Sequence, residues 1–477
     1  MTENELAFAS IEEVAPLIRK KKISPVELTE MMLRRIGRLN PRLNAYITVT
    51  AELAMKQARK AEAEISAPRS RARYRGPLHG IPISLKDNIH TAGVRTTAGS
   101  KILSEFISDE DATVVALLKR AGAVLLGKTN MHEFAYGVTS NNPHFGAVRN
   151  PWDLQRSPGG SSGGSAAALA AGLCYASVGT DTGGSIRIPS ALCNVVGLKP
   201  TFGRVSCHRV IALAASLDHT GPLARTVHDA GTVLGIIAGF DPLDANAVAK
   251  AVPDYSREIS RPLRKLRVGW PKEYFWEKLD AEVRRLCEAE AQSFQKIGAK
   301  IEVVSLPHVA EGDDPSTAIA LAEARAYHEG QGWFPARATE YSEESRKRLE
   351  MGANVRAVDY IRAFEVRRVV RADFDVAFET VDAILAPVVP FAAPLIEDKI
   401  ARASYGEEPV RSGLLRMNRP SNYTGLPAIS IPCGFTTAGL PVGLQLIGRA
   451  FEEGRLLQIA RAYEQAHEWH LCQPPLE

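Results

Sequence analysis

The chain has 477 residues, 45% of them hydrophobic and 23% charged, which is the composition of an ordinary globular protein. Its 58 basic residues exceed its 54 acidic residues by too little to indicate a nucleic acid or an anionic membrane as partner. The six cysteines form no CxxC motif, and the start of the chain lacks the regions of a secretory signal. No apolar run is long enough to cross a membrane. These features favour the cytoplasm.

The first well-defined predicted element is a helix that begins after residue 24. Residues 24–27 (Ser-Pro-Val-Glu) have the pattern of a capping box with proline at the first helical position. An apolar face follows at helical spacing and consists of Leu28, Met32, Ile36 and Leu39. The basic stretch 69–75 (RSRARYR) comes after a second helix, and we interpret it as a solvated linker rather than an anion site.

Short apolar runs then alternate with helical patterns. Predicted strands lie at 80–86, 123–130, 266–270 and 300–306, and predicted helices lie at 111–122, closed by Gly122, and at 280–297. Strands that alternate with helices predict a mostly parallel or mixed sheet covered on both faces. The runs 426–434 and 440–448, separated by Phe435–Gly439, predict a late hairpin.

Residues 122–129 match the GxxxxGK[ST] pattern of a phosphate-binding loop. Such a loop needs a strand before its first glycine and a polar turn whose N–H groups face the phosphate. Here the four intervening residues, AVLL, themselves form the predicted strand, and a helix precedes them. We therefore do not interpret this motif as a nucleotide site.

The stretch GGSSGGS at 159–165 has three possible interpretations: a flexible linker, a phosphate cradle, or a loop that holds a reacting serine. Its Gly-x-Ser-x-Gly spacing fits the nucleophile elbow of α/β-hydrolases, but a polar turn replaces the apolar strand that the elbow requires. A linker would separate two distinct units, whereas this stretch runs directly into a predicted small-residue helix and buried strand at 165–178. A rigid loop that packs against the core fits these residues better than a flexible linker or a nucleophile elbow.

A second glycine–serine loop lies one helix and one strand further on, at 180–189 (TDTGGSIRIP). A serine hydroxyl becomes a good nucleophile only when a base removes its proton, and a lysine can be that base because burial lowers its pKa. Glycines beside a serine let backbone N–H groups face a developing oxyanion. The two loops and the lysine that ends the strand at 80–86 form a chemical set for catalysis by serine.

These motifs resemble the amidase signature family and together cover most of the chain. The matching segments are 80–89, 127–137, 157–172, 179–190, 197–206, 216–226, 424–434 and 439–449. The resemblance implies an α/β fold, a single large α/β/α sandwich around a twisted mixed sheet, with one domain at residues 1–477. The helices before about residue 70 commonly pack on the core or a partner in this family, so a homodimer is a further expectation.

The resemblance also implies a serine mechanism that needs no metal and no cofactor. Ser185 would be the nucleophile that forms an acyl-enzyme. Ser161, held by a cis peptide bond to Gly160, would lie within hydrogen-bond reach of Ser185 and Lys86. Lys86 would be the neutral base that takes the proton from Ser161. The expected oxyanion hole consists of the backbone N–H groups of Thr182, Gly183, Gly184 and Ser185.

Further residues of the matching segments have two possible roles each. Ser162 and Arg187 resemble supports of the site, with Asp181 as ionic partner of Arg187, and a purely structural role is an equal alternative. Ala135 and Tyr136 occupy the substrate-wall position of the family, where an aromatic residue is nearly as often part of the core. The eleven histidines have no part in this scheme.

The family contains two functional classes: stand-alone amidases, and the A subunit of glutamyl-tRNA(Gln) amidotransferase, which releases ammonia from glutamine within a complex. Ile188 replaces a glutamine frequent in the second class, and residues 323–334 lack the Tyr-Asp-Gly…Arg segment expected there. Residues 414–418 (LLRMN) offer no acidic group to a glutamine ammonium. The sequence therefore favours a stand-alone enzyme that hydrolyses a small-molecule amide. The alternative is the glutamine-hydrolysing class, and an inactive scaffold is a third reading.

Overall fold

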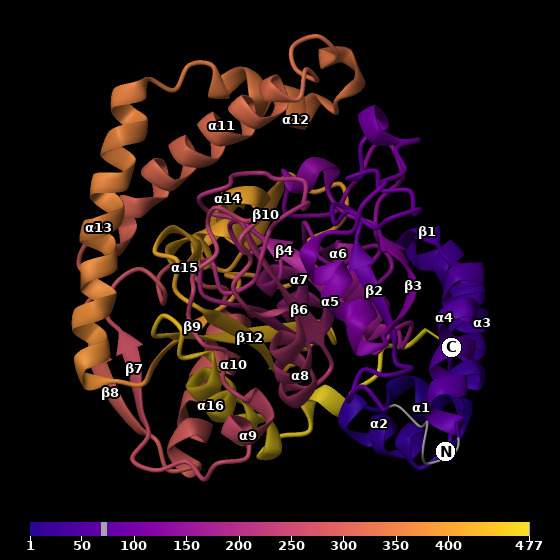
Figure 1. Ribbon diagram of the computed structural model, residues 1–477. Helices are drawn as coiled ribbons and strands as arrows, with labels where there is room; N and C mark the ends of the chain where they lie inside the picture. Colours follow the sequence, from indigo (N-terminus) through magenta and orange to yellow (C-terminus); the bar gives the residue numbers. More distant parts are fainter. Residues whose placement is uncertain (68–73, 477) are drawn as a thin grey trace.

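The structure is a computed structural model that describes residues 1–67 and 74–476 (Figure 1). The described residues build an 11-stranded sheet in the order β1-β3-β2-β4-β6-β5-β12-β13-β9-β7-β8. The bounds of these strands are β1 Tyr46–Val49, β2 Pro82–Lys86, β3 Val124–Thr129, β4 Ala176–Asp181, β5 Val196–Lys199, β6 His219–Ala224, β7 Arg267–Pro271, β8 Lys300–Val304, β9 Ala383–Pro387, β12 Ala428–Phe435 and β13 Pro441–Gly448. A separate pair consists of β10 Ile400–Ala403 and β11 Gly406–Pro409.

The sheet is mixed, as the sequence predicts. β2 pairs in parallel with both β3 and β4, and β7 pairs in parallel with both β8 and β9. The predicted late hairpin is confirmed, because β12 and β13 pair antiparallel. The predicted strand at 123–130 is also confirmed: β3 is buried along its whole length, and Lys128 donates within the protein to Ile89 O (2.7 Å) and Thr96 Oγ1 (2.9 Å). The phosphate-loop pattern is therefore part of the core.

Helices cover both faces of the sheet (Figure 1). Their bounds are α1 Glu3–Phe8, α2 Ile11–Arg19, α3 Pro25–Leu43, α4 Ala51–Ser66, α5 Thr113–Ala121, α6 Gly163–Ala170, α7 Arg187–Cys193, α8 Val227–Ile237, α9 Tyr255–Ile259, α10 Ala281–Lys296, α11 Asp313–Gly330, α12 Glu343–Gly352, α13 Ala357–Thr380, α14 Val410–Arg416, α15 Arg419–Tyr423 and α16 Glu453–Gln465. Among them, α11, α12 and α13 form an outer arm in Figure 1. No helix in the described part of the chain is long and apolar enough to cross a membrane.

The amino-terminal helices pack on the protein's own core. The predicted apolar face of α3 is buried, and the Ser24 hydroxyl accepts hydrogen bonds from the N–H groups of Val26 (3.0 Å) and Glu27 (3.3 Å). The other half of the predicted capping box is wrong in the described structure, because there the Glu27 side chain makes no bond back to the cap and the Ser24 hydroxyl donates to Glu62. Most of the basic stretch 69–75 lies outside the described residues.

Small residues allow α6 to lie directly against the core. Every residue of α6 is buried, and so is every residue of β4, which follows it. A Cβ atom on Gly164 would lie 2.3 Å from Asn130 O and 2.5 Å from Ala45 O, far inside van der Waals contact. The glycine–serine loop before α6 is thus fixed by close backbone packing, which confirms the prediction of a rigid loop.

Candidate active site

The site forms where two parallel neighbours of the sheet end. Leu85 of β2 lies opposite Val178 of β4, so Lys86, the last residue of β2, comes close to the end of β4. The carboxyl ends of parallel strands meet at one edge of a sheet and are the usual place for a site in α/β proteins. The loop after β4 carries Ser185, and the loop before α6 carries Ser161.

Lys86 is completely buried among hydroxyl groups. Its Nζ donates to Ser161 Oγ (2.7 Å) and to Thr180 Oγ1 (2.7 Å). Burial lowers the pKa of Lys86 to about 7, although the negative charges of Asp181 and Asp218 act in the opposite direction. A substantial fraction of this lysine is therefore neutral at neutral pH, as a base requires. Thr180 is a partner that the sequence prediction missed, although it lies within a matching segment.

The peptide bond between Gly160 and Ser161 is cis, as predicted. Ser161 is buried, and its carbonyl oxygen accepts from His132 N (3.3 Å) and from Ser140 Oγ (3.3 Å). The same Ser140 hydroxyl accepts from Gly163 N (3.1 Å). These bonds hold the Ser161 side chain against Lys86.

Ser185 is 5% exposed, at the cavity. Among the described residues the Ser185 hydroxyl makes no hydrogen bond, so its predicted approach to the Ser161 hydroxyl stays a prediction. Catalytic hydrogen bonds often tighten only when substrate is bound. The two loops are nevertheless joined, because Ser162 N donates to Ser185 O (3.1 Å) and Ser162 Oγ donates to Thr180 O (3.2 Å). Ser162 thus has a structural role, because its two hydrogen bonds join the Ser161 loop to the Ser185 loop.

The predicted oxyanion donors need one correction. The N–H group of Gly184 donates to Asp181 Oδ1 (2.7 Å), so it is turned away from the cavity and is occupied. Within the described chain the N–H groups of Thr182, Gly183 and Ser185 have no hydrogen-bond partner. These three remain candidate donors to an oxyanion. The hydroxyl of Thr182 donates to Asp218, an acceptor that the sequence prediction missed.

The predicted ion pair between Asp181 and Arg187 is confirmed, with 3.1 Å between Oδ2 and Nε. Burial alone would raise the pKa of Asp181, but the charge and hydrogen bonds of Arg187 hold it below its ordinary value. Arg187 is buried and also donates to Ser421 Oγ (2.7 Å), Gln445 Oε1 (3.0 Å), Asn422 Oδ1 (2.6 Å) and Asn418 O (3.1 Å). The pair ties the nucleophile loop to β13 and α15. This explains its place in the motif.

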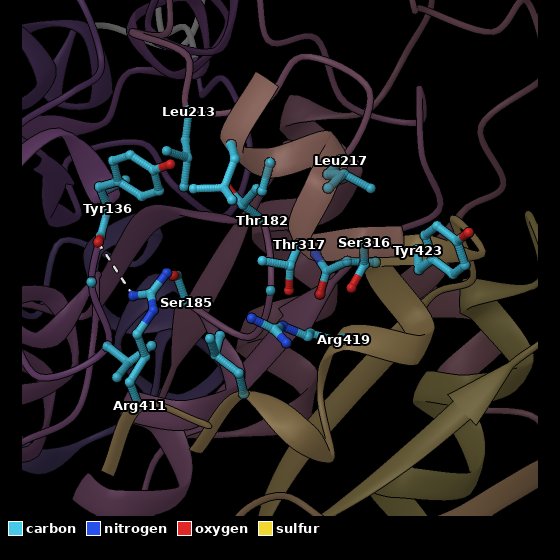
Figure 2. A pocket seen from close by; sticks show the side chains of 18 residues that line it. Tyr136, Thr182, Ser185, Leu213, Leu217, Ser316, Thr317, Arg411, Arg419 and Tyr423 are labelled. Atoms are coloured by element: carbon cyan, nitrogen blue, oxygen red, sulfur yellow. Dashed lines mark hydrogen bonds between the residues drawn. The ribbon is translucent and has the colours of Figure 1, made fainter. Parts of the chain in front are cut away.

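A small cavity of about 60 Å³ lies above Ser185 (Figure 2). Ala135 and Tyr136 line one side of it, as predicted, and Ala135 has a φ of 59°, unusual for a residue with a side chain. The oxyanion loop forms another side. Ser316 and Thr317 of α11 also line the cavity. Arg411 and Leu415 of α14 and Arg419 of α15 complete this part of the wall. The sequence predicts that residues 414–418, which include Leu415, lie near the substrate, but it does not indicate the other four, which come from distant segments.

In the described part of the chain no group of three His, Cys, Asp or Glu side chains could hold a metal ion. The ring of His132 lies 3.4 Å from the Glu344 carboxylate. The backbone of His132, rather than its ring, contacts Ser161.

Comparisons with known proteins agree with this geometry. The model of the family described as Amidase matches residues 27–457. The chain belongs to the amidase signature family. The A subunit of the glutamyl-tRNA(Gln) amidotransferase from Carboxydothermus hydrogenoformans is 42% identical over 99% of this chain and 100% of its own length. The coarse activity, cleavage of an amide C–N bond, follows from family membership.

Solved structures of this family share the fold. The crystal structure of the A subunit of the glutamyl-tRNA(Gln) amidotransferase from Thermotoga maritima has a TM-score of 0.81 at 37% identity, with 99% of this chain and 98% of that chain covered. A structure of a vestigial protein complex, described as revealing the evolutionary origins of an s-triazine catabolic enzyme, has a TM-score of 0.90 at 34% identity, with 96% and 98% covered. The predicted fold class is thereby confirmed.

Proposed function

We propose that this chain hydrolyses a carboxamide through an acyl-enzyme on Ser185. The observation that carries the proposal is the buried contact of 2.7 Å between Lys86 Nζ and Ser161 Oγ, at a lysine whose pKa is lowered to about 7. A buried hydroxyl next to a partly neutral amine can pass a proton to it. Ser185 lies at the cavity on the adjoining loop, joined to the Ser161 loop by the bond from Ser162 N.

In the first step Ser185 Oγ bonds to the amide carbon while its proton passes to Ser161 and the proton of Ser161 passes to Lys86. The carbonyl oxygen gains negative charge, which the N–H groups of Thr182, Gly183 and Ser185 stabilise. The C–N bond then breaks as the proton returns to the leaving nitrogen, and an ester on Ser185 remains. Water cleaves this ester by the same proton path in reverse and regenerates the serine.

Glutamine is the amide donor that the relatives support. The relative that matches over its full length is an amidotransferase A subunit, and a solved structure of the same name covers almost the whole chain. This similarity supports the glutamine-hydrolysing class more strongly than the stand-alone amidase that the sequence motifs favour. With that donor the chain would act with further subunits. A cytoplasmic location, a single domain and a homodimer stay predictions.

A stand-alone amidase is the second candidate because of one feature of the cavity. Among the described residues that line it there is no carboxylate, and Leu415 lies there instead. An ammonium group taken out of water needs an anionic or strongly accepting partner. The described lining thus lacks the carboxylate that would pair with the ammonium group of an amino acid.

Ammonia release by the purified chain alone tests both candidates. A stand-alone amidase should release ammonia from simple primary amides without ATP, tRNA or other subunits, whereas a member of the amidotransferase class should act on glutamine and gain activity from its partners. Ser185→Ala is the control in every assay. Retention of activity in Ser185→Ala would contradict the proposed function itself.

A further inference from the structure

Two arginines in the cavity have no anionic partner among the residues that the structure describes. Arg411 lies in the first turn of α14 and Arg419 begins α15. Arg411 Nη1 donates to Tyr136 O (3.3 Å), its one hydrogen bond in the described structure, and Arg419 makes none there. Neither side chain forms an ion pair with a described carboxylate. Each guanidinium carries five N–H donors, so most of this donor capacity is unused.

Arginines with a structural role in this protein donate hydrogen bonds to several protein acceptors. Arg187 has the five acceptors described above, and Arg225 donates to two backbone carbonyl groups. Arg204 lies 3.5 Å from Glu453 and donates to two carbonyl groups as well. Arg187, Arg204 and Arg225 are buried, whereas Arg411 and Arg419 are half-buried and line the cavity above Ser185. The unused donors of Arg411 and Arg419 are therefore open to the cavity, where a bound anion can accept hydrogen bonds from them.

The acidic side chains near the two arginines, Asp313, Asp314 and Glu344, form no ion pair with them. Asp313, close to Arg419, accepts from the Tyr274 hydroxyl (2.6 Å). On the far side of Arg411, Glu344 pairs with Arg348 and with His132. Burial and the positive charges of Arg348 and Arg419 lower the pKa of Arg411 to about 9. The cavity thus presents an excess of positive charge that an anion would neutralise.

Both arginines lie within reach of the reacting group. Cγ of Arg419 lies 3.9 Å from the position that a Cβ on Gly183 would occupy, so its stem passes the oxyanion loop. Figure 2 shows the guanidinium of Arg411 beside Ser185 and that of Arg419 beside Thr317. In a primary amide the leaving group is ammonia, so every other substituent belongs to the acyl part. An anion held here would therefore lie on the acyl group.

We propose that the substrate is an amide whose acyl group ends in a carboxylate held by Arg411 and Arg419, and that it needs no ammonium group. The inference rests on the proposed function and adds to it the chemical class of substrate. Paired N–H groups of arginine match the two oxygens of a carboxylate. The half-amide of a short dicarboxylic acid has this chemistry, whereas glutamine adds an ammonium for which the described lining has no carboxylate.

Three amides of equal chain length test the proposal: glutaramate, which has the carboxylate alone, glutamine, which has both charges, and pentanamide, which has neither. We expect kcat/KM for glutaramate to exceed that for pentanamide by about 100-fold, since hydrogen bonds to charged groups contribute roughly 1.5–3 kcal/mol each. Arg411→Gln and Arg419→Gln should each lower the ratio of glutaramate to pentanamide about tenfold or more, mainly through KM for glutaramate. Arg402→Gln, at a side chain 84% exposed, is the matched control and should leave the ratio unchanged.

A second readout needs no turnover. Glutarate should slow the labelling of Ser185 by a fluorophosphonate, and this protection should be lost in Arg411→Gln and Arg419→Gln. Equal rates for glutaramate and pentanamide, a tenfold preference for glutamine over glutaramate, or labelling that glutarate does not slow would each overturn the substrate proposal while the proposed function stands. Absence of both labelling and hydrolysis would instead contradict the proposed function, and this proposal with it.

Discussion

At the scale of single residues, the chemistry depends on a lysine that the fold keeps away from water. Lys86 has two hydroxyl partners and no carboxylate partner in the described chain, so burial determines its pKa. The lysine is a base only in its neutral form. The pKa of about 7 therefore defines the pH range in which the site becomes active.

The first prediction concerns this pH range. Below the pKa of Lys86 the fraction of neutral lysine falls about tenfold per pH unit, so kcat/KM should rise with pH, pass half its maximum near pH 7 and stay high into the mildly alkaline range. A pH–rate profile of the free enzyme checks this. Lys86→Ala should lose several orders of magnitude of activity at every pH, whereas His132→Asn should keep the profile. A profile that is flat from pH 5 to 9 would contradict a lysine base.

The second prediction concerns Thr180, the other partner of Lys86 Nζ. Thr180→Val removes the accepting hydroxyl at nearly constant volume, so Lys86 should lose its position and kcat/KM should fall about 10–100-fold. Thr180→Ser keeps the hydroxyl and should restore most of the activity. The pH profile separates positioning from a general loss of structure, because its midpoint should shift in Thr180→Val and return in Thr180→Ser. Equal rates and midpoints in the two variants would show that Thr180 is not a positioning residue.

At the scale of elements, the position of the site depends on close contact between α6 and its surroundings. The glycines of α6 belong to the same run as the glycines of the serine loop, and their missing side chains leave room for backbone atoms. A methyl group at such a position has no space unless the helix moves.

The third prediction compares two helical glycines. Gly164→Ala would place a methyl group 2.3 Å from Asn130 O, so the variant should lose about 3 kcal/mol or more of the free energy of unfolding. Gly37→Ala, on an exposed position of α3 with no atom within 4 Å of the new methyl, should gain roughly 0.5–1 kcal/mol. Denaturant unfolding measures both. If Gly164→Ala unfolds at the same denaturant concentration as the unchanged protein, the close packing of α6 is wrong.

The same distinction explains which elements could be predicted from the sequence. Helix α5 is readable because Gly122 ends it at a φ of 82°, and β3 because its apolar run is buried on both faces. The ion pair between Asp181 and Arg187 could be inferred because both belong to one short loop and helix start. The orientation of Gly184 N–H could not, since it depends on which of several neighbouring N–H groups the Asp181 carboxylate binds.

At the scale of the whole molecule, one sheet brings distant segments together. β4 lies between β2 and β6, and β5 joins this half of the sheet to the late hairpin. The cavity accordingly combines the oxyanion loop with α11, α14 and α15, which follow it by more than 100 residues. Because these segments lie far apart along the chain, no local sequence motif predicts that Arg411 and Arg419 line the cavity. The reacting residues could be predicted, because each lies in a local motif.

The most direct test of the mechanism is the intact mass of the protein after reaction with a fluorophosphonate, followed by mapping of the modified residue. Fluoride leaves as the serine oxygen bonds to phosphorus, so the adduct marks the nucleophile. We predict one adduct, on Ser185, which is absent in Ser185→Ala and forms several orders of magnitude more slowly in Lys86→Ala. An adduct on Ser161, or undiminished labelling in Lys86→Ala, would contradict the proposed proton path from Ser185 through Ser161 to Lys86.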